Sequence, residues 1–253
     1  MNNSNATAAG TEQDQKHGYF AWFLPFRCIL FLSVSLIGAA VTGKQIGEIK
    51  SWWSITASAA NILTILLLLL LTKKEHISYR SLIRYRKGSL PFKKAAGLIA
   101  GFVITGMACM YLAGLLCYGS IMPRAALDII APIPPVLAVI NAVVLPLTVP
   151  FAEDGLYLGC GVNHIGSRTA ALLIPAFFYA VQHCFIPTIF DIRYMLYRFL
   201  SFLPLTVIFC LYYRKQRNPM PAMVSHAILD AATGAMILMT SVSPALYEKW
   251  CSL

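Results

Sequence analysis

The stretch APIPPVLAVINAVVLPLTVPFAEDGLYLG, residues 131–159, decides the fold and raises the main question about function. Most of it is apolar enough to cross a bilayer, which needs a helix of about 20 apolar residues. Its first twenty residues contain five prolines, and breaks in backbone hydrogen bonding persist in lipid only where protein or a wet cavity supplies partners. We therefore predict a kinked membrane helix beside a cavity, just ahead of the adjacent acids Glu153 and Asp154.

The rest of the chain is also typical of a membrane protein. It has 253 residues, of which 58% are hydrophobic and only 12% are charged, whereas soluble domains are roughly 25% charged. Apolar runs recur along most of the length and leave no room for a soluble domain of ordinary size. The sequence predicts an all-α polytopic integral membrane protein, with a single membrane domain over residues 19–253.

The apolar runs predict seven transmembrane helices. Their approximate limits are 20–41, 53–71, 95–117, 135–158, 169–190, 195–213 and 221–241. The densest basic cluster lies between Lys73 and Lys94, and basic loops favour the cytoplasmic side. The loops that contain Arg168 and Arg214 then lie on the same side, which supports this count. We expect a cytoplasmic amino terminus and a bacterial cell membrane.

The tail and the net charge exclude other classes. Residues 1–18, MNNSNATAAGTEQDQKHG, lack the basic start and apolar core of a signal peptide, so we expect a disordered cytoplasmic tail. The net charge of +10 comes from basic residues between apolar runs, so membrane topology and anionic lipid explain it, and no nucleic-acid partner is expected. The seven cysteines form no CxxC pair and are typical of small core residues.

Acids and histidines concentrate in the fourth, fifth and seventh predicted helices. Ionisable groups are costly in lipid and usually face the bundle interior or a wet cavity. The residues concerned are Glu153, Asp154, His183, His226 and Asp230. Three pairs are spaced by four residues, which places each pair on one helix face. They are Glu153 and Tyr157, Tyr179 and His183, and His226 and Asp230. If these faces converge, they form a pocket between helices four, five and seven.

Such a pocket suits the activation of water. A buried Glu153 can act as a general base near neutral pH, with His183 holding and polarising the water. His226, oriented by Asp230, can stabilise an oxyanion that develops on a peptide carbonyl. The residue types therefore favour hydrolysis of a peptide bond.

At these positions the chain resembles the CPBP intramembrane proteases, which include the CaaX prenyl endopeptidases and the bacteriocin-processing, Abi-type proteins. The first motif of this family is two acids, two residues, an aromatic, Arg and Gly, and EDGLYLG is similar to it. The second motif, an aromatic four residues before a His, resembles YAVQH at residues 179–183. The third, a His four residues before Asn or Asp, resembles HAILD at residues 226–230. The motif region covers about residues 135–241.

The resemblance implies an intramembrane endopeptidase with no metal and no cofactor. It implies that Glu153 and His183 activate the attacking water, while His226 and Asp230 stabilise the oxyanion. The supporting residues are Asp154, Tyr157 and Tyr179. The implied partners are a membrane peptide or protein substrate and the lipid bilayer, and the sequence identifies neither the substrate nor the oligomeric state.

Two departures from the family pattern leave other readings open. The Arg of the first motif is Leu158, and Asp230 stands where many members carry Asn. A catalytically silent relative that acts as a membrane binding or immunity protein would tolerate both changes. A metal-dependent hydrolase is a further alternative, although the chain has no HExxH pair. A transporter would place polar residues on more spans.

Two local alternatives concern the charged residues themselves. In one alternative the fourth helix ends before Glu153 and Asp154, and both acids are then solvated at the membrane interface. Arg27 and Arg198 lie within predicted spans, and we expect their charged ends to reach the interface. The other possibility for them is that one supplies the positive charge missing at Leu158.

Overall fold

The computed structural model describes residues 18–86, 88 and 90–252. Nearly all of the tail expected over residues 1–18 lies outside the described residues, and Gly18 begins a 3-10 helix that ends at Phe23. The described residues form helices and contain no strand. The predicted all-α class is confirmed.

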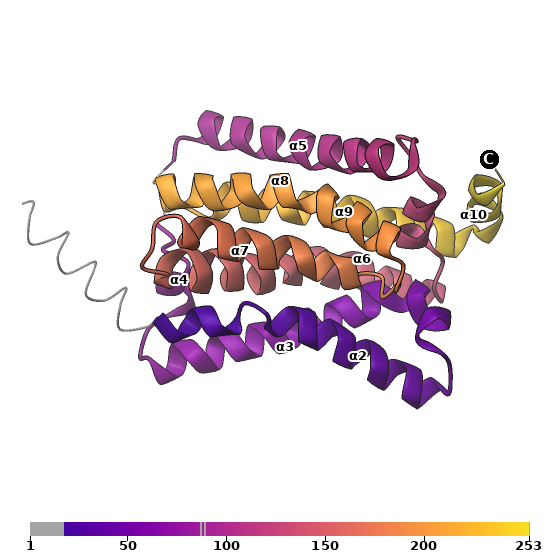
Figure 1. Ribbon diagram of the computed structural model, residues 1–253, viewed down its shortest axis with the longest axis horizontal. Helices are drawn as coiled ribbons and strands as arrows, with labels where there is room; N and C mark the ends of the chain where they lie inside the picture. Colours follow the sequence, from indigo (N-terminus) through magenta and orange to yellow (C-terminus); the bar gives the residue numbers. More distant parts are fainter. Residues whose placement is uncertain (1–17, 87, 89, 253) are drawn as a thin grey trace, which may run out of the picture.

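Long helices run side by side along one axis of the molecule (Figure 1). They are α2 (Phe26–Thr42), α3 (Trp53–Lys74), α5 (Phe92–Tyr118), α6 (Pro135–Val149), α7 (Ala170–Val181), α8 (Ile192–Gln216) and α9 (Met220–Val242). A π-helix, η4 (Pro150–Val162), continues α6. The shorter elements are the 3-10 helices η1 (Gly18–Phe23), η2 (Ile46–Trp52), η3 (Arg124–Ile130) and η5 (Gln182–Phe185), and the helices α4 (Tyr79–Leu82) and α10 (Pro244–Cys251).

Six helical stretches of the described chain are long and apolar enough to cross a membrane. They are Gly18–Thr42, Ile46–Lys74, Phe92–Tyr118, Pro135–Val162, Ile192–Gln216 and Met220–Val242. The fifth predicted span, 169–190, is instead a shorter apolar helix over Ala170–Phe185. At 1.5 Å per residue such a stretch is roughly 24 Å long, which is less than the hydrocarbon thickness of about 30 Å. The predicted count of seven is therefore not confirmed.

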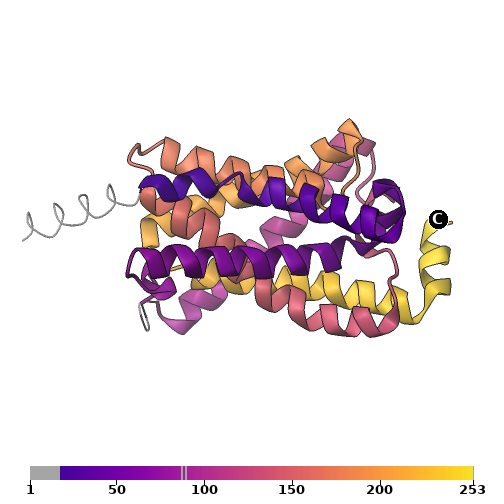
Figure 2. The same cartoon turned by 90° about the horizontal axis from the view of Figure 1, so that it is seen from below.

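The π-helix lies in the middle of the bundle. It contacts α3, α7, α8 and α9, while α6 packs against α9 and α5 packs against α8. Seen from below, α2 and α3 lie in front of the other helices of the bundle (Figure 2). Residues that are more than one hundred positions apart in the sequence therefore surround the segment that carries Glu153 and Asp154.

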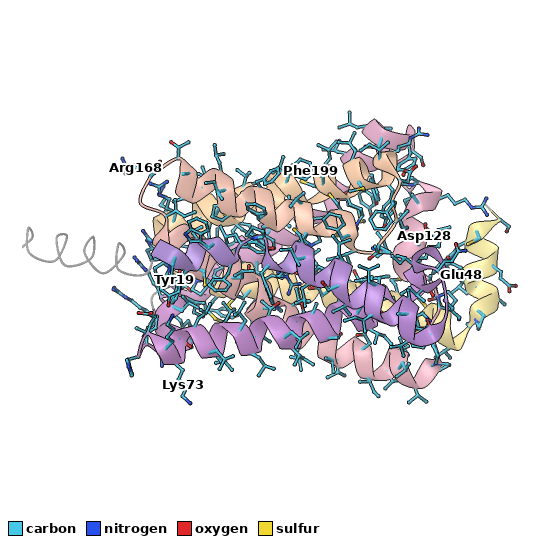
Figure 3. All side chains as sticks on the ribbon, turned by 60° about the horizontal axis from the view of Figure 1, so that its bottom comes forward. Tyr19, Glu48, Lys73, Asp128, Arg168 and Phe199 are labelled. Carbon is cyan, nitrogen blue, oxygen red and sulfur yellow. The ribbon has the colours of Figure 1, made fainter. Side chains whose placement is uncertain are left out.

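Basic residues gather at one end of the bundle. Figure 3 shows Tyr19, Lys73 and Arg168 at this end, and Glu48 and Asp128 at the opposite end. The Arg214 guanidinium donates a hydrogen bond to the Arg168 carbonyl, which brings the α8–α9 connection to the same basic end. The basic loops thus share one side, as the charge pattern predicts.

Glycines allow the π-helix to pack closely on its neighbours. A Cβ on Gly161 would lie 2.7 Å from Pro175 Cγ on α7, and a Cβ on Gly155 would lie 2.9 Å from Leu68 Cδ1 on α3. Neither glycine has a positive φ, so space rather than backbone conformation explains them. Helix packing without a Cβ between the backbones is common in membranes.

We expect Gly161→Ala to destabilise the protein by about 1–3 kcal/mol, because the rigid Pro175 ring leaves no room for the added methyl group. Gly97→Ala on α5 is the matched control, since no atom lies within 4 Å of its added Cβ, and it should be neutral or stabilise by up to about 1 kcal/mol. Thermal unfolding in detergent measures both. Equal stability of the two variants would contradict this account of the packing.

Candidate active site

The π-helix carries both acids into the protein interior. Glu153 is 3% exposed and Asp154 is fully buried. Pro150 begins the π-helix and Pro146 lies within α6, so the predicted interruption ahead of Glu153 is a change of helix type. π-helical turns are rare and are frequent at functional sites. The alternative in which the two acids are solvated at the interface is wrong for this fold.

Arg27 on α2 binds Glu153 directly. Its Nη2 lies 2.7 Å from Glu153 Oε1, and the Arg27 side chain is fully buried. The expectation that its charged end reaches the interface is wrong, because polar groups inside the bundle satisfy it. Those further acceptors are Gln182 Oε1 at 2.6 Å, Asn61 Oδ1 at 2.9 Å and Thr64 Oγ1 at 3.1 Å.

Arg198 on α8 is also buried, so the same expectation fails for it. Its Nε donates to the Ile186 carbonyl at 2.9 Å, and its guanidinium lies over the Phe202 ring. Neither arginine supplies the positive charge missing beside Asp154, since Arg27 pairs with Glu153 and Arg198 bonds a backbone carbonyl.

Gln182 holds the second oxygen of Glu153. Its Nε2 donates to Glu153 Oε2 at 2.7 Å, and its Oε1 also accepts a hydrogen bond from Tyr157 at 3.2 Å. Sequence reasoning missed Gln182, Asn61 and Thr64, because neutral polar residues without paired spacing give little signal within a span. The only signal in the sequence for any of the three was that Gln182 is next to His183.

Two imidazoles face Glu153 Oε2. His183 Nε2 lies 3.9 Å from this oxygen and His226 Nε2 lies 3.7 Å from it. His183 Nδ1 donates to the Tyr179 carbonyl at 2.9 Å, which leaves Nε2 as the acceptor in the neutral ring. The His183 ring stacks on Phe202 with a centroid distance of 3.5 Å, so it is fixed in orientation.

Tyr179 joins the second acid to the second histidine. Its hydroxyl donates to Asp154 Oδ1 at 2.8 Å and lies 2.9 Å from His226 Nδ1. Because a phenol has one proton, His226 Nδ1–H donates to the Tyr179 oxygen. His226 Nε2 is then directed toward Glu153 and toward Asp230 Oδ2, which is 3.5 Å away.

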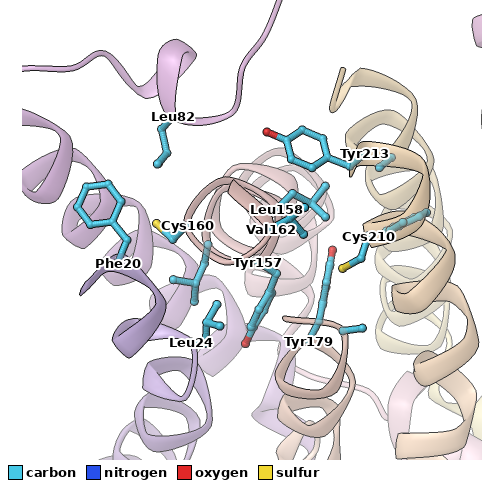
Figure 4. Packing of buried hydrophobic residues seen from close by; sticks show 14 of the residues in the cluster. Phe20, Leu24, Leu82, Tyr157, Leu158, Cys160, Val162, Tyr179, Cys210 and Tyr213 are labelled. Carbon is cyan, nitrogen blue, oxygen red and sulfur yellow. The ribbon is translucent and has the colours of Figure 1, made fainter. Parts of the chain in front are cut away.

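Leu158 leaves part of Asp154 without a partner. Leu158 is fully buried in an apolar cluster that includes Cys210 and Tyr213 of α8 (Figure 4). The oxygens Asp154 Oδ2 and Asp230 Oδ2 make no hydrogen bond with the residues that the structure describes. The group nearest to Asp154 Oδ2 that can carry a positive charge is His226, whose Nδ1 is 3.5 Å away.

The structure brings together all seven residues that the sequence singled out. The π-helix provides Glu153, Asp154 and Tyr157, and the α7–η5 segment provides Tyr179 and His183. The Tyr157 and Tyr179 rings stack with centroids 4.5 Å apart (Figure 4). α9 provides His226 and Asp230. The arrangement combines a carboxylate, two imidazoles and a buried positive charge in one site.

The residue types of the site are ones that can bind a metal, but their arrangement is not that of a metal site. Within the described part of the chain, no group of three or more His, Cys, Asp and Glu residues is placed to hold a metal ion. Each oxygen of Glu153 already accepts a hydrogen bond, from Arg27 or from Gln182. The geometry therefore gives no support to the metal-dependent alternative.

The fold and the site together define a class: an integral membrane protein of many helices with a buried acid–histidine site. Residues 135–232 match the family model described as type II CAAX prenyl endopeptidase Rce1-like. This segment belongs to the CPBP family, a family of proteases, as the three motifs predict. No curated protein and no solved structure matches the chain. The matched segment contains both acids and both histidines, whereas Arg27 lies outside it.

We expect Tyr179→Phe to destabilise the protein by about 1–3 kcal/mol, because Asp154 and His226 both lose a buried hydrogen-bond partner. Tyr212→Phe is the control, since the buried Tyr212 hydroxyl bonds no described residue and its loss should cost nothing. Chemical or thermal unfolding in detergent compares the two. If Tyr179→Phe were as stable as Tyr212→Phe, the Tyr179 hydroxyl would not link the two groups.

Proposed function

We propose that this protein is an intramembrane endopeptidase that hydrolyses a peptide bond with a water activated by glutamate and histidine. The observation that carries the proposal is the position of Glu153 Oε2, 3.9 Å from His183 Nε2 and 3.7 Å from His226 Nε2. These separations are too long for direct hydrogen bonds, and a bridging water is the group that suits such gaps.

Glu153 and His183 act on the water. Glu153 Oε2 takes one proton from the water as the water oxygen forms a bond to the peptide carbonyl carbon. The His183 Nε2 lone pair accepts a hydrogen bond from the other O–H of the water, and this hydrogen stays on the oxygen. The carbonyl electron pair moves onto its oxygen. When the tetrahedral intermediate collapses, the C–N bond breaks and the proton held by Glu153 passes to the leaving amine.

His226 and Asp230 act on the oxyanion. A proton held between His226 Nε2 and Asp230 Oδ2, which are 3.5 Å apart, is the hydrogen-bond donor for the developing negative charge. A protonated pair also removes the repulsion that an ionised Asp230 would exert on an oxyanion. Tyr179 fixes the imidazole from its other nitrogen.

We further infer a cytoplasmic position for the basic end of the bundle, and with it for the amino terminus, in a bacterial cell membrane. The substrate is a membrane peptide or protein. Glu153, His183 and His226 are at most 7% exposed, so the helices must separate to admit it. The Asp230 side chain is 21% exposed, which favours entry beside α9.

Glu153→Gln and His183→Ala should each lower cleavage of a membrane peptide substrate by roughly 100-fold or more, because the general base and its partner are lost. Glu48→Gln, the same change at the opposite end of the bundle, should cleave like the parent. Peptide release by purified protein in detergent or vesicles, followed by mass spectrometry, measures this. Parent-like cleavage by Glu153→Gln would disprove the proposal.

A catalytically silent membrane binding or immunity protein is the second candidate. The observations that favour it are Leu158 in place of the motif Arg and the unpartnered oxygen of Asp154. It requires the cellular role to survive Glu153→Gln, while the endopeptidase requires that role to be lost. A cellular assay with parent, Glu153→Gln and Glu48→Gln therefore separates the two functions.

Asp230→Asn should retain cleavage and extend it to higher pH. A protonated Asp230 loses its proton as pH rises, so the parent loses its oxyanion donor on the alkaline side, whereas an amide has no such transition. Asp230→Ala, which has no donor, should be slower at every pH. The pH dependence of kcat measures the effect, and an alkaline limb that is identical in parent and Asp230→Asn would contradict it.

A further inference from the structure

Arg27 is an arginine fully buried within the first apolar span, and such a residue needs a physical reason. A charged side chain inside a membrane helix is costly and usually marks a functional site. Four side-chain acceptors receive its hydrogen bonds, and its guanidinium also lies 5.0 Å from the centre of the Phe31 ring. Only one of these acceptors, Glu153, carries a negative charge. The carboxylate of Glu153 therefore compensates the buried positive charge of Arg27.

Both oxygens of Glu153 depend on the same guanidinium. Arg27 Nη2 binds Oε1 directly at 2.7 Å. Arg27 Nε binds Gln182 Oε1 at 2.6 Å, and this contact turns the Gln182 amide so that its Nε2 donates to Glu153 Oε2 at 2.7 Å. The Tyr157 hydroxyl, a donor to the same Gln182 oxygen, fixes the amide in the same orientation.

We propose that Arg27 is a positioning residue that keeps Glu153 ionised and directs its Oε2 at the two histidines. This inference rests on the proposed endopeptidase function. It places a positively charged positioning residue on the first helix, outside the segment that matches the family.

The physical argument concerns the protonation of a carboxyl group in lipid. A carboxylate buried without a partner takes up a proton, and a protonated Glu153 cannot act as a base. A neighbouring guanidinium favours the ionised form, and its fixed donors also prevent rotation of the carboxylate. Because Oε1 is fully engaged with Arg27, the oxygen left to accept the proton from water is the one that faces His183 and His226.

A positive charge at position 158 would not take over the role of Arg27, even with Arg in place of Leu158. It lies among apolar residues toward α8, four residues after Asp154 and five after Glu153. An arginine there, four residues from Asp154, would be placed to pair with the Asp154 oxygen that makes no hydrogen bond with the described residues, whereas Glu153 already pairs with Arg27. The two positive charges therefore act on different acids.

Replacement of Arg27 tests the proposal through kcat, KM and the pH profile. Arg27→Gln should lower kcat by 100-fold or more and change KM by less than about threefold, because Arg27 does not face the substrate. The acid limb of the kcat profile should move to higher pH by about 1–3 units, since the loss of a paired cation makes Glu153 harder to ionise. Arg27→Lys keeps the charge without the fork of donors, so it should restore the acid limb and only part of kcat.

The control variant is Arg193→Gln, which removes an exposed arginine near the end of the bundle opposite the basic loops and should leave the rate and the profile unchanged. An acid limb that stays in place in Arg27→Gln, with parent-like kcat, would overturn the role of Arg27 while Glu153→Gln is still inactive. Parent-like cleavage by Glu153→Gln would instead overturn the endopeptidase function.

A spectroscopic measurement tests the charge state of Glu153. It needs no cleavage assay, and its main comparison does not depend on whether the Arg27→Gln variant folds. At neutral pH the infrared spectrum of the parent should contain no protonated-carboxyl C=O band that is missing from the spectrum of Glu153→Gln, because Glu153 is ionised beside Arg27. Arg27→Gln, where it folds, should gain such a band, and Arg27→Gln with Glu153→Gln should lose it. A protonated-carboxyl band from Glu153 in the parent would overturn the proposal.

Discussion

The ion pair of Arg27 and Glu153, at 2.7 Å, is the contact on which the site depends. It joins the first apolar span to the π-helix, and it places the positive charge of Arg27 directly against Glu153. Breaking a buried pair by removing one partner typically costs about 3–5 kcal/mol, because the remaining charge has no compensation. The polar groups around it, Asn61, Thr64 and Gln182, complete a network that the low dielectric of the interior strengthens.

The π-helix makes this contact possible. Proline at position 150 ends the regular α-helical pattern, and glycines at 155, 159 and 161 let the following backbone approach α3, α4 and α7 without an intervening Cβ. Helical backbone with altered hydrogen bonding is stable at membrane depth only when protein surrounds it. Here every residue from Ala152 to Val162 is buried, so packing, ion pair and helix type support one another.

The site separates its two acids by environment. Glu153 is paired with a guanidinium, whereas Asp154 shares Tyr179 and His226 and keeps one oxygen without a hydrogen bond. Asp230 contacts His226 from the other side. Three carboxyl groups thus surround one imidazole, and the protons that they share with it decide which nitrogen atoms donate. This arrangement accommodates Leu158 and Asp230, the two departures from the family pattern.

The sequence by itself predicted the membrane class, the resemblance to the CPBP family and the seven polar residues that meet in the interior, since apolar length and four-residue spacing are local properties of a chain. It also predicted the break ahead of Glu153, because proline cannot donate a backbone hydrogen bond. Tertiary structure alone decided that Arg27 turns inward, that Gln182 joins the site, and that the fifth predicted span is a short helix ending in a 3-10 turn. These outcomes depend on which distant side chains meet in the interior, where a buried charge is stable only beside its partner, and spacing along one helix contains no record of that partner.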